Sequence, residues 1–269
     1  MIGEQLRAQK NRLEAELRKV LFGRRIFSPL RNTYQFVFNR DKLSNRRLMR
    51  KLYSSYIRRG DLVFDVGANA GIYTETFLEL GAQVVAVEPN PYCCRFLQRL
   101  VHNRNVKIES CAVGSATGKI LLQLSDNTQL STVNQNWLNS VKRSPLHAGA
   151  SWLGGIEVEL TTLDRLAEKH GTPNFIKIDV EGFDDQVLLG MSFIPEALTF
   201  EFNRLLPDVA MKCIGMPTLS SNYEFNCLRE STKYASPEWL SAEALAAKID
   251  TLAGEEQSVD IIARRIARK

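Results

Sequence analysis

Beyond residue 60 the chain alternates short apolar runs with longer amphipathic segments. This alternation is typical of βαβ units around a largely parallel sheet. We therefore expect a doubly wound α/β domain with a seven-stranded, mostly parallel sheet over residues 60–269. The predicted strands span residues 62–66, 83–87, 106–111, 175–178, 198–202, 224–228 and 259–263. The predicted helices span residues 71–80, 91–102, 163–170, 183–189 and 237–249.

Two shorter apolar runs, at residues 119–124 and 157–161, predict short strands at the edge of this sheet, the first of them as a hairpin extension. The intervening residues 125–156 are rich in Ser, Asn, Gly and Trp and are too long for a plain connection. They predict either a lid or substrate-binding insertion or a partly helical segment. Trp137 and Trp152 in this segment could grip the ring of an acceptor or pack in the core.

Residues 1–59 have a different pattern and predict a helical extension. Apolar positions at helical spacing favour an amphipathic helix over residues 1–21, closed by Gly23 and the Ser28-Pro29 pair. A second helical stretch runs from about residue 42 to residue 58, and Gly60 ends it. The extension carries a net charge of +12 and the remaining residues one of −7.

The basic extension could bind an anionic membrane surface or another acidic partner, pair two subunits in a homodimer, or be a solvated helical face. We expect no specific nucleic-acid binding. Because no apolar run is long enough for a membrane span and charges interrupt the first 20 residues, we expect a cytoplasmic protein, either free or peripheral to a membrane. Five cysteines without C-x-x-C spacing indicate reduced, buried thiols.

The segment Asp65-Val66-Gly67-Ala68-Asn69-Ala70-Gly71 lies between the first strand and the first helix of the domain. Gly67 permits a sharp turn, and Gly71 permits close approach to the start of the helix. Such a loop can hold a nucleotide-like ligand, although glycine turns also occur for structural reasons alone. Glu88, at the end of the next strand, stands where a carboxylate can bind a ribose diol.

The charge of the loop distinguishes between two adenosine cofactors. The loop reads G-x-N-x-G in place of the dinucleotide pattern G-x-G-x-x-G, and Asp65 precedes it. That carboxylate would repel a pyrophosphate but would suit the ammonium and sulfonium groups of S-adenosylmethionine. We therefore expect S-adenosylmethionine as the cofactor. The alternatives are a nicotinamide-dependent oxidoreductase and a non-catalytic scaffold that binds an acidic partner through the extension.

A second motif, Phe175-Ile176-Lys177-Ile178-Asp179-Val180-Glu181-Gly182-Phe183, places two carboxylates just beyond a buried strand. Open α/β sheets bind ligands at this end of their strands. If the strand pattern continues, Asp179 and Glu181 point to the same side. The alternative is that Asp179 caps the following helix.

Together with Leu163-Asp164 and Thr199-Phe200-Glu201, these two motifs resemble the FkbM-type methyltransferases over about residues 60–265. The resemblance implies the Rossmann-like class I methyltransferase fold with an antiparallel last strand. It also implies S-adenosylmethionine and O-methylation of a sugar, glycan or secondary-metabolite hydroxyl. The chain departs from the family at Asp184-Asp185, where the family more often has Glu and an apolar residue. With the charge argument for Asp65, the candidate cofactor-binding residues are Asp65, Gly67, Ala68, Asn69, Gly71, Glu88, Pro89, Asn90, Ala112 and Asp179.

An alcohol acceptor must lose a proton during methyl transfer, which calls for a general base within hydrogen-bond reach. Asp179 and Glu181 are the candidate catalytic residues, and His147 is a more distant one. Asp179, Glu201 and Asn203 could alternatively supply oxygen ligands for Mg²⁺, or could simply bond backbone or the cofactor's ammonium. We do not expect a resident metal ion.

Overall fold

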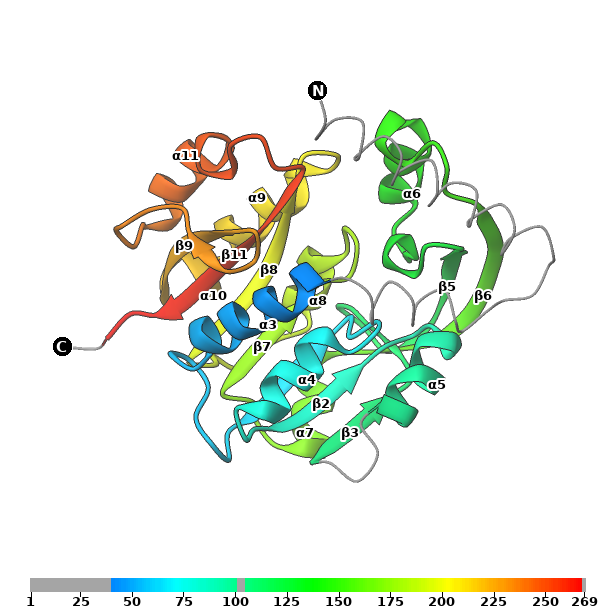
Figure 1. The fold of residues 1–269 in the computed structure, drawn as a ribbon, viewed down its shortest axis with the longest axis horizontal. Coiled ribbons are helices and arrows are strands. Elements are labelled where there is room, and N and C mark those ends of the chain that lie inside the picture. The colour runs from blue at the N-terminus through cyan, green and yellow to red at the C-terminus, as the bar shows by residue number, and fades with distance from the viewer. Residues whose placement is uncertain (1–39, 101–104, 268–269) are drawn as a thin grey trace. The chain divides into compact units, whose positions relative to one another are not determined.

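An eight-stranded sheet runs through the computed structural model, which describes residues 40–100 and 105–267 (Figure 1). The strand order is β10-β9-β11-β8-β7-β1-β2-β3. The five strands from β8 to β3 are parallel, and β11 runs antiparallel to both β8 and β9. The strands are β1 (Leu62–Val66), β2 (Gln83–Val87), β3 (Val106–Glu109), β7 (Phe175–Ile178), β8 (Ala197–Asn203), β9 (Tyr223–Arg229), β10 (Lys233–Tyr234) and β11 (Ser258–Arg265).

This sheet confirms the predicted mostly parallel architecture and the antiparallel last strand. All seven predicted strands belong to it. The eighth, β10, has two residues and pairs antiparallel with β9 at the edge. A two-residue strand is too short to leave a periodic pattern in the sequence, so periodicity does not predict it.

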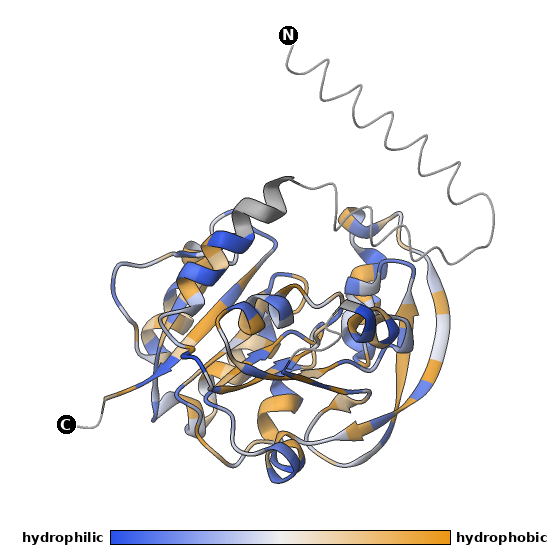
Figure 2. Ribbon diagram, turned by 60° about the horizontal axis from the view of Figure 1, so that its bottom comes forward, coloured by the Kyte–Doolittle hydropathy of each residue, from blue (hydrophilic) through white to orange (hydrophobic). Residues whose placement is uncertain are grey.

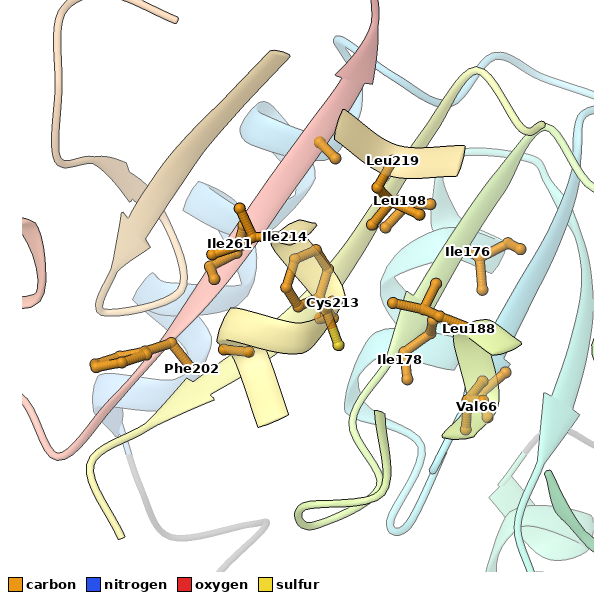
Figure 3. Packing of buried hydrophobic residues seen from close by; sticks show 14 of the residues in the cluster. Val66, Ile176, Ile178, Leu188, Leu198, Phe202, Cys213, Ile214, Leu219 and Ile261 are labelled. Atoms are coloured by element: carbon orange, nitrogen blue, oxygen red, sulfur yellow. The ribbon is translucent and has the colours of Figure 1, made fainter. Parts of the chain in front are cut away.

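Apolar cores cover both faces of the sheet because successive residues of a strand point to opposite sides. Val63 packs with α3 and α4, whereas Phe64 belongs to the core on the other face. Figure 3 shows part of that second core, where Ile178 and Leu188 lie beside Cys213. The first face carries α3 (Arg40–Tyr53), α4 (Ile72–Glu79) and α5 (Pro91–Leu100), and the second carries α7 (Leu163–His170), α8 (Asp184–Leu189), α9 (Pro207–Gly215), α10 (Pro217–Ser220) and α11 (Ala242–Ala253).

Helix α3 is part of the compact unit, which comprises residues 41–269. Met49, Leu52 and Tyr53 are buried and pack with Phe77 and Phe175. The ring of Tyr53 meets those of Phe77 and Phe175 edge to face, at centroid distances of 5.3 and 5.6 Å. Met49, Leu52 and Tyr53, which the sequence assigns to the basic extension, therefore pack on the sheet. The helix predicted over residues 1–21 lies outside the described residues.

A separate three-stranded sheet contains the two short runs predicted for the edge of the main sheet. It consists of β4 (Ala112–Val113), β5 (Gly118–Ser125) and β6 (Trp152–Thr161), in the order β4-β6-β5. The two runs pair antiparallel with each other, but the predicted position at the main sheet's edge is wrong because β6 takes β4 as its second partner. Figure 2 shows hydrophobic and hydrophilic residues alternating along β6, as expected for a half-buried strand.

The segment between β5 and β6 is partly helical, which was one of the two predicted alternatives. It contains η1 (Thr128–Leu130), α6 (Gln135–Arg143) and η2 (Pro145–His147). Trp137 is buried and packs with Leu130 and Val141, so this tryptophan belongs to a local core. Trp152 is half-buried, and the Lys142 Nζ lies 5.4 Å from the centroid of its ring.

Helices α9 and α10 are absent from the sequence-based prediction. Each has a proline in its first turn, Pro207 and Pro217, which is a favoured position for this residue. The predicted helix at residues 237–249 begins later, after Ser241, whose hydroxyl accepts a hydrogen bond from the Ala244 N–H. All five cysteines are buried and unpaired. In residues 40–100 and 105–267 no helix has the length and apolar character needed to cross a bilayer.

Candidate functional site

The loop after β1 is held to the end of β2 by backbone hydrogen bonds. The N–H groups of Gly67 and Ala68 both donate to the Val87 carbonyl, at 2.9 and 3.1 Å. Gly67, Asn69 and Gly71 all have positive φ, at 82°, 44° and 78°. The predicted sharp turn is therefore present, and Gly71 immediately precedes α4.

Glu88 ties this loop to the exit of β2. Its Oε2 accepts a hydrogen bond from the Asn69 N–H at 2.8 Å, and its Oε1 accepts one from the Asn90 N–H at 2.7 Å. Burial raises the pKa of Glu88 to about 7, although the two backbone N–H donors oppose the shift. A carboxylate oxygen has two lone pairs, so each oxygen can still accept a hydrogen bond from a ligand hydroxyl.

Asp65 is buried at the end of β1 and only half satisfied. Its Oδ2 accepts a hydrogen bond from the Thr74 hydroxyl at 2.5 Å, whereas its Oδ1 has no hydrogen-bond partner among the described residues. Burial raises the pKa of Asp65, while Lys177 and the Thr74 hydroxyl oppose the shift. An unpaired buried carboxylate oxygen is costly. This oxygen therefore fits the ammonium group of a ligand.

Asp179 begins the loop after β7 and lies against the glycine loop. Its N–H donates to the Val66 carbonyl at 3.0 Å. A Cβ at Gly67 would lie 1.8 Å from the Asp179 carbonyl oxygen, so the two loops are in direct contact. The Asp179 side chain is 34% exposed, and its Oδ2 accepts a hydrogen bond from the Lys177 Nζ at 2.8 Å.

The strand pattern ends before Glu181, so the condition for Asp179 and Glu181 to point to the same side of a strand is not met. Strand β7 stops at Ile178, and Glu181 and Gly182 have φ values of 55° and 83°. Alternation along a strand therefore does not align Asp179 with Glu181. The alternative that Asp179 caps α8 is also wrong, because Phe183 occupies the N-cap position.

Several acids nevertheless gather at this end of the sheet. Burial, reinforced by the negative charges of Glu201 and Asp179, raises the pKa of Glu181 well above its usual range. Burial and the charge of Asp179 similarly raise the pKa of Asp184 to about 7. Proximity to one another and to Asp179 makes protonation of these carboxyls easier near neutral pH. The site is therefore rich in carboxyl groups, some of which hold their protons more tightly than usual.

The remaining predicted residues lie around the two loops. The Asn90 side chain is buried, and its Oδ1 accepts a hydrogen bond from the Tyr92 N–H at 3.0 Å next to the half-buried Pro89. Ala112 opens β4 and pairs with Leu160. His147 lies in η2, beyond α6.

The structure offers no support for a magnesium site within the described ranges. No group of three or more His, Cys, Asp or Glu side chains there has a metal-binding arrangement. The Asn203 Oδ1 already accepts hydrogen bonds from the Leu205 N–H at 3.0 Å and the Gln257 amide at 3.3 Å.

The segment between β5 and β6 contacts both loops through side chains that lie outside the predicted motifs. The Thr128 hydroxyl donates to the Asn69 Oδ1 at 3.0 Å, and the Thr132 hydroxyl donates to the Glu181 carbonyl at 2.9 Å. The Asn134 amide donates to the Gly182 carbonyl. Nothing in the local sequence indicates these long-range partners.

Residues 65–214 match the family model described as the methyltransferase FkbM domain, which spans more than half of the 269-residue chain. Comparison with curated proteins finds no match. Solved structures with a similar chain include a precorrin-6y C5,15-methyltransferase from Geobacter metallireducens, with a TM-score of 0.42 and 12% identity over 81% of this chain and 87% of that one.

Two further solved structures have lower TM-scores. A SAM-dependent O-methyltransferase from Thermotoga maritima has a TM-score of 0.39 and 8% identity, over 87% of this chain and 67% of that one. A tRNA (uracil-54, C5)-methyltransferase from Pyrococcus abyssi, in complex with S-adenosyl-L-homocysteine, has a TM-score of 0.40 and 9% identity, over 83% of this chain and 38% of that one.

Proposed function

The chain belongs to the methyltransferase FkbM domain family and is an S-adenosylmethionine-dependent methyltransferase, and we propose that it methylates a hydroxyl group of an uncharged acceptor such as a sugar, glycan or secondary metabolite. The observation that carries this proposal is the acidic character of the site, together with the unpaired buried Oδ1 of Asp65. Both favour a cationic cofactor and disfavour an acceptor with phosphate groups.

We assign the cofactor to the two sides of the glycine loop. The Asp65 Oδ1 would receive the ammonium group, and the free lone pairs of Glu88 would receive the ribose hydroxyls. The backbone of Gly67, Ala68, Asn69 and Gly71 would line the cofactor, flanked by Pro89 and Asn90. Ala112, in β4, would contact the adenine through its backbone. When bound, S-adenosylmethionine supplies an electrophilic methyl group.

The two candidate catalytic carboxylates differ in their surroundings, which suggests different roles. Asp179 is paired with the ammonium of Lys177, a contact that fixes its orientation. Glu181 lies beside other acids, and burial together with their charges raises its pKa, so that its ionised carboxylate is a stronger base than that of an ordinary glutamate. We therefore assign to Glu181 the removal of the acceptor's proton, and to Asp179 the orientation of the acceptor or cofactor.

Incubation of the purified protein with methyl-labelled S-adenosylmethionine and a fractionated metabolite extract tests this proposal. We expect the label in neutral hydroxyl compounds, and we expect its incorporation to be lost in Glu181→Gln. The matched control is Glu159→Gln, which removes an exposed carboxylate of β6 and should leave incorporation unchanged. Label found only in phosphate-bearing compounds would contradict the proposed acceptor class.

A further inference from the structure

Lys177 is a fully buried cation in the middle of the main sheet. It is 1% exposed and lies in β7, where its register partners are Asp65 of β1 and Thr199 of β8. Removing an ammonium group from water is expensive unless opposite charges and hydrogen bonds compensate for the loss. The groups that surround the Lys177 ammonium therefore indicate which neighbouring side chains its charge stabilises.

Those groups are acids and one aromatic ring. The Lys177 Nζ donates to the Asp179 Oδ2 at 2.8 Å and lies 4.1 Å from the centroid of the Tyr73 ring, within cation–π range. The Tyr73 hydroxyl in turn donates to the Oδ2 of the buried Asp260 at 3.2 Å. Asp65, the register partner of Lys177, keeps its Oδ1 unpaired beside this arrangement.

We propose that Lys177 is a positioning residue for cofactor binding, whose ammonium orients the Asp179 side chain and keeps the neighbouring Asp65 carboxylate ionised so that its free Oδ1 can receive the cofactor's ammonium group. The inference deepens the proposed function and rests on the cofactor role given there to Asp65.

The balance of charges around the pair supports this role. Burial raises the pKa of Asp65, and Lys177 is the strongest influence in the opposite direction. Burial alone would lower the pKa of Lys177, but Asp179, Asp260 and Asp65 together raise it above its usual value. Lys177 therefore stays protonated at physiological pH. Without it, the buried Asp65 carboxyl would hold a proton at higher pH.

Other titratable groups face this pair from several elements, and none of them is a cation. They are Tyr53 of α3, Tyr73 of α4, Glu88 after β2, Asp179 and Glu181 after β7, Asp184 of α8 and Asp260 of β11. Burial raises the pKa of both tyrosines well above the usual range, so they remain neutral. Within this group of described residues, Lys177 carries the compensating positive charge.

Calorimetric titration with S-adenosylhomocysteine tests the proposal. The Kd of Lys177→Met is divided by the Kd of the wild type at each pH between about 6 and about 8.5, which cancels any titration of the ligand itself. We expect a ratio of roughly ten or more at the lowest pH, because each unit by which the Asp65 pKa exceeds the pH costs about tenfold. The ratio should fall as the pH rises and Asp65 ionises.

A ratio that is the same at every pH would overturn the proposal, because a purely structural role for Lys177 predicts no trend. If circular dichroism shows that Lys177→Met does not fold, Lys177→Met/Asp260→Asn takes its place, since it removes one buried acid along with the cation. The same falling ratio is expected of it. Failure of the wild type itself to bind S-adenosylhomocysteine would instead refute the proposed cofactor site.

Discussion

The carbonyl oxygen of Asp179 lies where the side chain of any larger residue at Gly67 would begin. A Cβ at Gly67 would be 1.8 Å from that oxygen, and the Gly67 φ of 82° also disfavours other residues. The contact joins the glycine loop after β1 to the carboxylate loop after β7. Because both partners are backbone groups, a larger residue cannot be accommodated by a change of rotamer alone.

Gly67→Ala should therefore be strongly destabilising, by more than about 3 kcal/mol, because it combines a backbone clash with strain at positive φ. Gly60→Ala is the matched control. Gly60 has a φ of 91°, but a Cβ added there would meet no atom within 4 Å, so we expect a loss of only about 1 kcal/mol. Urea unfolding measures both losses, and equal values would show that the contact with Asp179 is unimportant.

Asn134 connects the segment between β5 and β6 to the carboxylate loop. Its Oδ1 accepts hydrogen bonds from the Asn136 and Trp137 N–H groups at the start of α6, while its amide donates to the Gly182 carbonyl. Asn134→Ala should lower the free energy of unfolding by about 1–2 kcal/mol, the range for loss of an N-cap. Asn136→Ala changes an exposed side chain of the same helix and should have little effect. Similar losses in the two variants would argue against the tether.

Asp184 should make the protein less stable as the pH rises. Burial, with the charge of Asp179, raises its pKa to about 7, above the value of about 3.9 expected in the unfolded chain. The folded state therefore binds the proton more tightly. Its contribution to stability is fully present below about pH 4 and is lost progressively up to about pH 7.

Asp184→Asn removes this titration and keeps an oxygen for the Glu201 N–H, which donates to the Asp184 Oδ1 at 3.3 Å. We expect the variant to be more stable than the wild type at about pH 8, by on the order of 2 kcal/mol, and to match it near pH 4. Asp185→Asn is the comparison, because Asp185 pairs with Lys212 at 3.6 Å and its removal should bring no gain. Thermal unfolding across this pH range checks both variants, and an unchanged pH profile for Asp184→Asn would refute the explanation.

The sequence predicts the main sheet well because its strands carry strong local signals. The run from Leu62 to Val66 and the run from Phe175 to Ile178 are apolar apart from Asp65 and Lys177, and both are strands of the central sheet. The sequence does not predict the separate second sheet, because the pairing of β6 with β4 depends on contacts distant in sequence. The change in net charge predicts a boundary at residue 59, but the packing of Met49 and Tyr53 against the sheet is a tertiary effect that charge does not reveal.

The residues of the candidate site also divide into those that a local sequence pattern predicts and those that it does not. The positions of the glycine loop and of Glu88 follow from a local pattern, and in the structure the Asn69 N–H of that loop donates to the Glu88 carboxylate. The turn at Glu181 could not be foreseen, because its positive φ occurs in a residue that rarely adopts it. A signal for Lys177 was available, since a lysine inside a strand buried on both faces needs a partner, and Asp179 is that partner.

The central claim is that the Asp65 carboxylate receives the cofactor's ammonium group, and calorimetric titration with S-adenosylhomocysteine at neutral pH tests it most directly. Asp65→Asn keeps an oxygen for the Thr74 hydroxyl but removes the charge, and Asp208→Asn, at an exposed acid of α9, is the control with the same change in net charge. We predict that the wild type and Asp208→Asn bind equally and that Asp65→Asn binds about 10- to 100-fold more weakly, the range for a lost charge-assisted hydrogen bond. Equal affinity of Asp65→Asn and the wild type would contradict the claim.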